Sequence, residues 1–195
     1  MKRNVSRLAI PVVTKLEACG NYGGTGCVIK RHGQFFLVTA AHLFQRISPP
    51  TNQWEEWEPV LELLLRSNQA PIALRMFNSE GNNLKPEFSF IYSQQQGEGV
   101  ILDIVAIPIH ELQIVKKLAE NYGIISIDTT QTPPSKNSTL HILGYPSSNQ
   151  RYLRARQPKT VTGTLVEYNS AQFITHVKTE NGFSGGPIFK GYPCN

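Results

Sequence analysis

Short apolar segments alternate with turn-forming residues along most of the chain. Residues 25–29 and 34–39 are two such segments, joined by Lys-Arg-His-Gly, and they predict a β-hairpin. Further strands are predicted at residues 8–16, 60–65, 72–77, 88–92, 100–109, 124–127, 140–143, 161–168, 173–177 and 187–189. Many short strands separated by turn signals are typical of an all-β barrel or sandwich.

Three segments depart from this pattern. The glycine-rich residues 20–24 predict a turn, and residues 40–47 predict one helical turn. Residues 110–122 place apolar side chains on one helical face, formed by Leu112, Val115, Leu118 and Ala119. We expect this short amphipathic helix to connect two domains, residues 1–115 and residues 116–195.

The segment at residues 54–58 reads Trp-Glu-Glu-Trp-Glu, which is an unusual mixture of indoles and acids. One interpretation is a loop whose indoles cover the end of a barrel. The other is an insertion that binds a partner or gates a substrate, because exposed aromatic residues often mark contact surfaces. The loop interpretation is the simpler of the two.

Residues 181–187 read Asn-Gly-Phe-Ser-Gly-Gly-Pro and carry the most informative side chain, Ser184. Glycines allow the backbone to turn tightly and to aim several N–H groups into one small space, which suits an oxyanion hole. A serine hydroxyl is a weak nucleophile at neutral pH, so it needs a base that a carboxylate orients. His42 follows an apolar strand, and Asp103 is a lone acid in the apolar run 103–107.

Three motifs now stand in order: Thr-Ala-Ala-His at 39–42, Asp-Ile-Val-Ala at 103–106 and Gly-Phe-Ser-Gly-Gly-Pro at 182–187. With them the chain resembles the trypsin-like (chymotrypsin-fold) serine proteases from about residue 8 to residue 189. The resemblance implies two antiparallel β-barrels of the chymotrypsin type. The first domain would carry His42 and Asp103, and the second would carry Ser184.

The resemblance also implies a mechanism and a set of roles. Ser184 would attack a peptide carbonyl to form an acyl-enzyme, His42 would carry the proton, and Asp103 would orient His42. The N–H groups of Gly182 and Ser184 would hold the oxyanion. By position in the motif, the substrate pocket would be lined by His176, Lys178 and Thr179. This chemistry requires no metal and no organic cofactor.

The other candidate acids and bases have structural interpretations. His32 falls in a predicted turn, His110 at a junction between strand and helix, and His141 inside a strand. Asp128 is interpreted as a turn-forming aspartate.

Two departures from the family pattern leave a second function open. The chain ends eleven residues after Ser184, at Asn195, where relatives continue for several strands, so it is either truncated or has an abbreviated second barrel. Phe183 stands where digestive relatives carry an aspartate that pairs with a newly cleaved amino terminus. We therefore expect packing, a partner or substrate to order this loop. The alternative function is an inactive, protease-like scaffold that binds protein through residues 54–58.

The net charge raises a third possible class of function, nucleic-acid binding, but the positions of the basic residues do not support it. The 195 residues carry a net charge of +5 and have a pI near 9.2, as some nucleic-acid-binding proteins do. The basic residues are scattered, apart from the amino terminus and Arg151, Arg154, Arg156 and Lys159, for which a solvated loop is the simpler interpretation. We expect protein or peptide substrates, within a larger regulatory or defence assembly, rather than nucleic acid or a membrane.

Cysteine usage and the amino terminus predict the compartment. The chain has three cysteines, an odd number that argues against a full disulfide framework. In extracellular relatives a cysteine near position 27 pairs with the residue after the histidine, which here is Leu43. No run is as apolar and as long as a secretory signal or a membrane span. These features predict a soluble, cytoplasmic protein.

Overall fold

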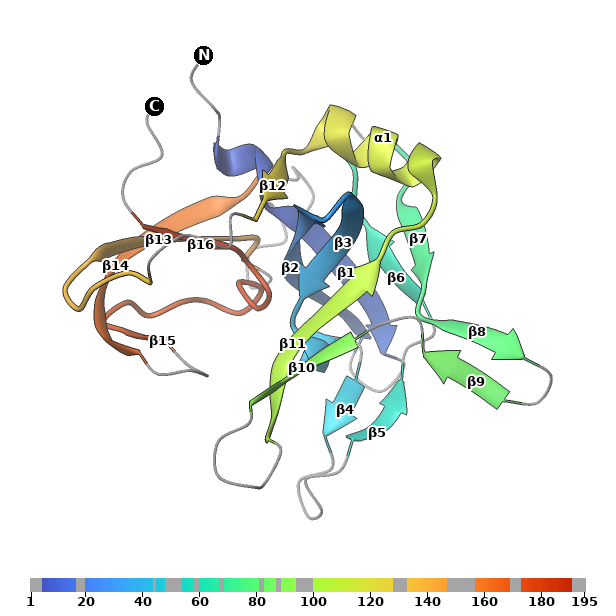
Figure 1. Cartoon of the computed structure of the whole chain (residues 1–195), viewed down its shortest axis with the longest axis horizontal. Coiled ribbons are helices and arrows are strands. Elements are labelled where there is room, and N and C mark those ends of the chain that lie inside the picture. Colours follow the sequence, from blue (N-terminus) through green and yellow to red (C-terminus); the bar gives the residue numbers. More distant parts are fainter. Residues whose placement is uncertain are drawn as a thin grey trace.

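The computed structural model of the chain describes residues 5–16, 20–43, 45–47, 54–57, 60–66, 69–80, 83–86, 89–93, 100–127, 133–146, 157–168 and 173–190. Within these residues strands predominate, with one α-helix and two single 3₁₀ turns. Figure 1 shows the strands gathered mainly into two sheets, formed by successive parts of the chain. The prediction of an all-β protein is confirmed.

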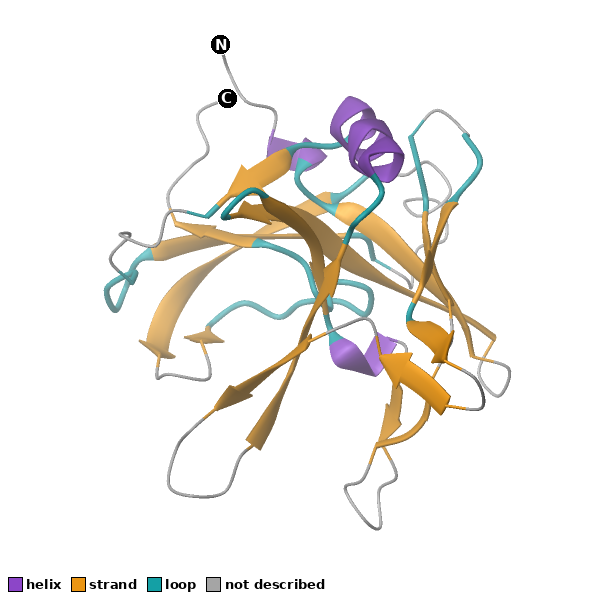
Figure 2. Ribbon diagram, turned by 45° about the vertical axis from the view of Figure 1, so that its right-hand side comes forward, coloured by secondary structure: helices purple, strands orange, loops and turns teal. Residues whose placement is uncertain are grey.

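The larger sheet curls into an open half-barrel (Figure 2). Its strands follow the order β10-β11-β3-β2-β1-β6-β7, and β12 pairs with β2 in parallel. Their bounds are β1 (Ile10–Leu16), β2 (Gly20–Arg31), β3 (Gln34–Thr39), β6 (Val60–Leu63), β7 (Ile72–Arg75), β10 (Ser89–Ser93), β11 (Val100–Pro108) and β12 (Ile124–Ser126). Side chains along a strand point alternately into and out of the barrel. In β7, for example, Ile72 and Leu74 are buried whereas Ala73 and Arg75 are exposed.

The predicted helix is present as α1 (Leu112–Asn121) and packs on this half-barrel. Val115 and Leu118 are buried in its core, but Leu112 and Ala119 are exposed, so only half of the predicted apolar face is used. Just after the helix, the hydroxyl of Tyr122 donates a hydrogen bond of 2.6 Å to the carbonyl of Leu64. Apolar contacts in the core, together with this hydrogen bond to the residue that follows β6, therefore hold the helix on the half-barrel.

The smaller sheet has the order β15-β14-β13-β16 and is antiparallel throughout. Its strands are β13 (Thr139–Gly144), β14 (Lys159–Tyr168), β15 (Phe173–Thr175) and β16 (Ile188–Lys190). A second buried cluster joins Leu143 and Tyr145, at the end of β13, to Ala9, just before β1. The two sheets therefore share a packed contact close to the amino-terminal end of β1.

Two hairpins lie outside the main sheets, and one of them corrects two of the local predictions. Residues 40–47 form only a 3₁₀ turn at Ala41–Leu43, followed by β4 (Gln45–Ile47). β4 pairs with β5 (Trp54–Trp57), so the loop predicted at residues 54–58 is wrong for these four residues. The other hairpin joins β8 (Phe77–Glu80) to β9 (Asn83–Pro86). In β4 and β5, backbone pairing between neighbouring segments overrode the local signals.

The turn predicted at residues 20–24 is also wrong, because these residues begin β2. They pair in unbroken register with β1, from Leu16 opposite Gly20 to Val12 opposite Gly24. The glycines serve close packing instead, since a Cβ added at Gly24 would collide with the side chain of Leu43. Pairing with a complete neighbouring strand, rather than glycine content, therefore determined the conformation of residues 20–24.

The division predicted between residues 115 and 116 falls within α1, and β12, which follows α1, pairs with β2 of the larger sheet. The two domains stay a prediction. Among the residues that the structure describes, no helix is long and apolar enough to cross a membrane.

Candidate active site

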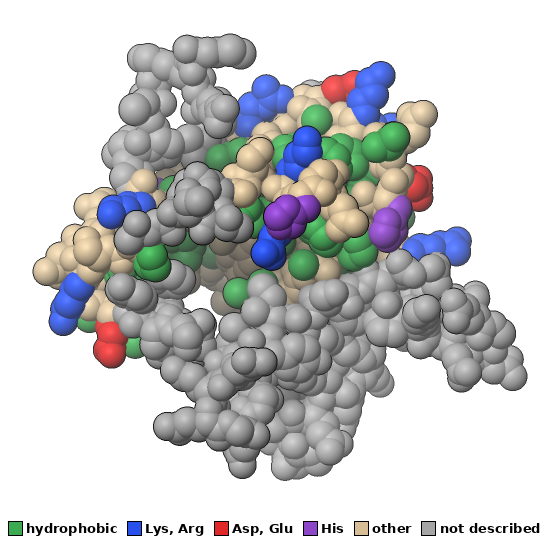
Figure 3. All heavy atoms as spheres, viewed as in Figure 1, with side chains coloured by type: hydrophobic (Ala, Val, Ile, Leu, Met, Phe, Trp, Pro, Cys, Tyr) green, Lys and Arg blue, Asp and Glu red, His purple; other side chains and the backbone are tan. Residues whose placement is uncertain are grey.

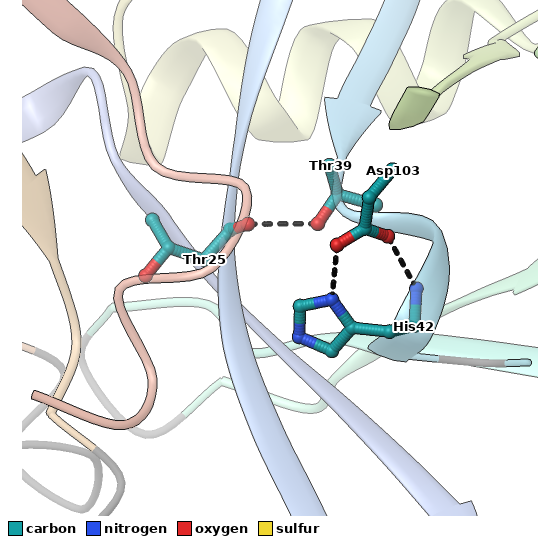
Figure 4. A network of polar contacts seen from close by, with 4 residues as sticks. All are labelled: Thr25, Thr39, His42 and Asp103. Carbon is teal, nitrogen blue, oxygen red and sulfur yellow. Dashed lines mark hydrogen bonds and ion pairs between the residues drawn. The ribbon is translucent and has the colours of Figure 1, made fainter. Parts of the chain in front are cut away.

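His42 and Asp103 meet through two hydrogen bonds. The backbone N–H of His42 donates to Asp103 Oδ1 over 2.8 Å, and the ring Nδ1 bonds to Asp103 Oδ2. Because a carboxylate can only accept, Nδ1 is the donor and the neutral ring keeps Nε2 as a proton acceptor. Figure 4 shows Nε2 directed away from Asp103. This arrangement orients an imidazole to act as a base.

Strand pairing explains why these two residues meet. β11 runs antiparallel to β3, with Val105 opposite Thr39. Asp103 lies two residues before Val105, and His42 lies three residues after Thr39, so both extend past the same end of the ladder. The period of two along β11 puts Asp103 on the face that carries buried Val105 and Ile107. At the end of the barrel this row leaves the core, and the Asp103 side chain is half-exposed.

Ser184 lies on the segment of residues 181–187, here called the serine loop, which is fastened to β2 at Thr25. The N–H of Thr25 donates to the carbonyl of Ser184 over 2.9 Å, and the Thr25 hydroxyl donates to the carbonyl of Gly182 over 2.7 Å. Figure 4 shows the faint red ribbon of this part of the chain passing beside Thr25. The structure thus brings the predicted nucleophile to the barrel that carries His42 and Asp103.

Gly185 permits this close approach. Its φ is +81°, in the region that favours glycine. A Cβ at this position would lie 2.5 Å from Thr39 Oγ1 and 2.6 Å from the backbone nitrogen of Ala40. The residue after Ser184 is therefore in backbone contact with the segment that leads into His42.

Phe183 anchors the serine loop on its other side. Only 5% of this residue is exposed, and its ring lies against Gly144 at the end of β13. The carbonyl of Phe183 also accepts a hydrogen bond of 2.9 Å from the N–H of Gly186. Of the three ways predicted to order the loop, the structure displays packing.

The backbone N–H groups of Gly182 and Ser184 are the predicted oxyanion donors. Gly182 has a φ of +99°, which turns the chain sharply just before Ser184. Within the described residues, neither N–H donates a hydrogen bond to another part of the chain. Both donors therefore remain available for an acceptor that binds beside Ser184.

The three residues predicted to contact substrate, His176, Lys178 and Thr179, are all exposed in the segment between β15 and the serine loop. The N–H of His176 bonds to the carbonyl of Thr164 over 3.2 Å. Glu180, at the start of the loop, forms an ion pair with Lys159 of β14. These residues precede the serine loop in the chain, and their contact with substrate stays a prediction.

Several other predictions concern residues without a role at this site. His141 is buried in β13 and bonds through Nδ1 to the hydroxyl of Thr162 over 3.0 Å, which confirms its structural interpretation. Cys27 is a buried free thiol in β2. The predictions for Asp128, the other two cysteines and the three arginines from 151 to 156 lie outside the described residues.

No protein-family model and no curated protein matches this sequence. Solved structures do match. The protease Anisep from Arthrobacter nicotinovorans aligns with a TM-score of 0.60 and 16% identity, over 98% of this chain and 80% of that one. The thermostable serine protease AL20 from an extremophilic microorganism aligns with a TM-score of 0.57 and 14% identity, over 96% of this chain and 80% of that one.

The serine endoprotease from Yersinia pestis also aligns, with a TM-score of 0.55 and 14% identity over 96% of this chain. The chain spans 51% of that protein's length. The chain has the chymotrypsin-like serine protease fold. At such low identities the likeness establishes this architecture, and the chemistry has to be argued from the chain's own residues.

Thr25 is the site residue whose role sequence reasoning missed. It lies between two glycines in β2, where small residues let the strand pass close to the site. It is fully buried, and its hydroxyl and both backbone groups are bonded. The available signal was a polar side chain between two glycines in the middle of a predicted strand, because buried polar groups almost always have a specific partner.

The basic side chains of the described residues can be followed on one face of the molecule (Figure 3). On the face drawn in Figure 3, the lysine and arginine side chains of the described residues are spread over several elements and form no single patch. That the chain does not bind nucleic acid stays a prediction from the sequence.

Proposed function

We propose that the chain is a serine endopeptidase that hydrolyses peptide bonds through an acyl-enzyme intermediate, with Ser184, His42 and Asp103 as its catalytic residues. One observation carries this proposal: His42 is held by Asp103 at two points, at the barrel end where Thr25 fastens the serine loop. The carboxylate on Nδ1 fixes the tautomer that leaves Nε2 able to accept a proton, as a general base requires.

In the first step, the Ser184 hydroxyl oxygen attacks the carbonyl carbon of the substrate, and its proton passes to His42 Nε2. Asp103 stabilises the imidazolium that forms. The tetrahedral intermediate collapses when the C–N bond breaks, and His42 gives its proton to the leaving amine. A water molecule then attacks the acyl-enzyme, again with His42 as the base, which releases the acid and restores Ser184.

The developing oxyanion needs donors that are in place beforehand. The N–H groups of Gly182 and Ser184 serve this role, since they flank the nucleophile and have no acceptor among the described residues. One donor of this kind typically contributes about 3 kcal/mol to transition-state stabilisation. The attachment of Gly182 and Ser184 to Thr25 supports the idea that both are held ready.

Protein or peptide substrates follow from this chemistry. We assign His176, Lys178 and Thr179 to the substrate side of the serine loop, where an exposed lysine would disfavour basic side chains in the substrate. A cytoplasmic location and membership of a regulatory or defence assembly remain predictions from the sequence.

Covalent labelling with diisopropyl fluorophosphate tests the proposal. The reagent phosphorylates an activated serine oxygen and releases fluoride, and peptide mass mapping identifies the modified residue. We expect label on Ser184, no label in Ser184→Ala, and labelling at least about 10²-fold slower in His42→Asn. Ser126→Ala and His32→Asn make the same chemical changes at exposed positions and should label like wild type.

A folded wild-type protein that takes no label at Ser184 would overturn the endopeptidase proposal and favour the protein-binding scaffold. Equal labelling of His42→Asn and His32→Asn would remove His42 from the mechanism. Folding of each variant is checked by its thermal unfolding curve.

A further inference from the structure

We propose that Thr25 is a positioning residue: its hydroxyl holds the peptide groups around Ser184 in the geometry that the reaction requires. This inference rests on the proposed function and adds a residue that touches neither the substrate nor the reacting atoms. It is carried by four hydrogen bonds that converge on one buried side chain and its backbone.

The hydroxyl of Thr25 has two partners of opposite kind. The backbone N–H of Tyr145 donates to Oγ1 over 2.9 Å, and Oγ1 lies 2.7 Å from the carbonyl oxygen of Gly182. Because an N–H can only donate and a carbonyl can only accept, the direction of both bonds is determined. Thr25 therefore joins the end of β13 to the serine loop through a single oxygen atom.

The backbone of Thr25 makes the other two bonds. β3 ends at Thr39, opposite Gly26, so Thr25 is the next β2 residue beyond that pairing. Its N–H bonds to the carbonyl of Ser184 over 2.9 Å, and its carbonyl accepts the hydroxyl of Thr39 over 2.7 Å. Figure 4 shows the Thr25–Thr39 bond beside the His42–Asp103 pair. One residue thus connects the serine loop with the strand end that leads to His42.

This arrangement controls the backbone on both sides of the nucleophile. Thr25 binds the carbonyls of Gly182 and Ser184, which are two residues apart. The backbone between these two carbonyls includes the N–H and the Cα atom of Ser184. The glycines of the loop, Gly182 and Gly185, adopt positive φ, so other conformations are readily accessible to them. Hydrogen bonds to a rigid, fully buried residue select one of these conformations.

Only the side-chain bonds distinguish threonine from other residues at this position. Valine keeps the shape and both backbone bonds, but it leaves the carbonyl of Gly182 and the N–H of Tyr145 without their partner. Serine keeps the hydroxyl. A displacement of about 1 Å in a catalytic group can lower the rate about 10²-fold. We therefore expect the loss in Thr25→Val to fall on the chemical step.

The test compares Thr25→Val and Thr25→Ala with Thr25→Ser, using steady-state hydrolysis of a casein-derived fluorogenic peptide that the wild type cleaves. We expect kcat to fall about 10²-fold in the first two variants, with KM changed less than about threefold, and to recover within about threefold in Thr25→Ser. Thr162→Val is the matched control, because it makes the same chemical change at a hydroxyl that bonds to His141 Nδ1, in the ladder between β13 and β14. It should keep the wild-type kcat.

Hydrogen exchange of the peptide spanning residues 181–187 supplies a readout that does not depend on activity. The N–H groups of Phe183 and Gly186, bonded to the carbonyls of Glu180 and Phe183, should exchange about tenfold faster in Thr25→Val and at the wild-type rate in Thr25→Ser and Thr162→Val. Wild-type kcat and wild-type exchange in Thr25→Val would overturn the inference, as would equal impairment of Thr25→Ser. An inactive wild type would refute the proposed function instead, and the exchange experiment would still decide whether Thr25 positions the loop.

Discussion

Replacing Phe183 with alanine tests whether packing alone orders the serine loop. Phe183 is 5% exposed, so alanine would empty a site filled by the ring against Gly144. A buried phenylalanine removes about 150–200 Å² from water, which at about 25 cal/mol/Å² gives an upper limit of roughly 4–5 kcal/mol. Measured Phe→Ala changes in protein cores are about 3–5 kcal/mol, so we expect at least about 3 kcal/mol here.

Two measurements separate the effect on stability from the effect on the site. In a chain of this size each kcal/mol lowers the melting temperature by about 2–4 °C, so the variant should melt at least about 6 °C lower. Labelling of Ser184 by diisopropyl fluorophosphate at 20 °C, where the variant is still folded, should slow by at least about tenfold. Phe35→Ala is the control, because Phe35 is half-buried in β3 and packs against the larger core cluster, which does not include Phe183. It should destabilise the protein and leave labelling unchanged.

A reciprocal substitution on the partner strand sharpens the test. A Cβ at Gly144 would lie 2.5 Å from Phe183 Cγ and 2.7 Å from its Cα, so Gly144→Ala should also displace the loop. Removing the ring relieves the first of these contacts, and the two substitutions should therefore be less than additive, with a coupling of about 0.5–3 kcal/mol. A Phe183→Ala protein with wild-type labelling and a stability change below about 1 kcal/mol would refute the packing argument, as would full additivity.

Two further predictions follow from single residues. Gly185→Ala should lower the free energy of unfolding, measured in urea, by at least about 2 kcal/mol more than Gly33→Ala does. Both glycines have a φ of +81°, but only Gly185 has backbone atoms where a Cβ would stand. Equal losses would contradict the tight contact at Gly185. Burial raises the pKa of the Cys27 thiol from 9.0 to about 12, so between these values the folded state retains a proton that the unfolded state releases. Urea unfolding at pH 8 and pH 10 should therefore show that the wild type loses stability as the pH rises, and that Cys27→Ala loses less. If Cys27→Ala loses as much stability as the wild type, the thiol is not the source of the pH dependence.

Much of the fold and three side chains of the candidate site were predictable from local signals. Short apolar runs between turn signals identified β3, β11, β13 and β14, and helical spacing identified α1, because each element's pattern reflects the surfaces that it buries. His42, Asp103 and Ser184 were identified because each is a reactive residue type placed next to a strand end or among glycines. Each of these features can be recognised from a few neighbouring residues in the sequence.

The tertiary structure decided the features that depend on partners far along the chain. Residues 20–24 became strand because β1 supplied a full ladder, and Phe183 became an anchor because β13 presents a glycine 39 residues earlier in the sequence. Thr25 connects residues up to 159 positions away, through bonds that no local pattern encodes. The sequence by itself determined which residues can do chemistry and which segments extend, since these follow from residue type and period. Only folding determined which carbonyls, rings and hydroxyls meet, since hydrogen bonds and packing act between neighbours in space.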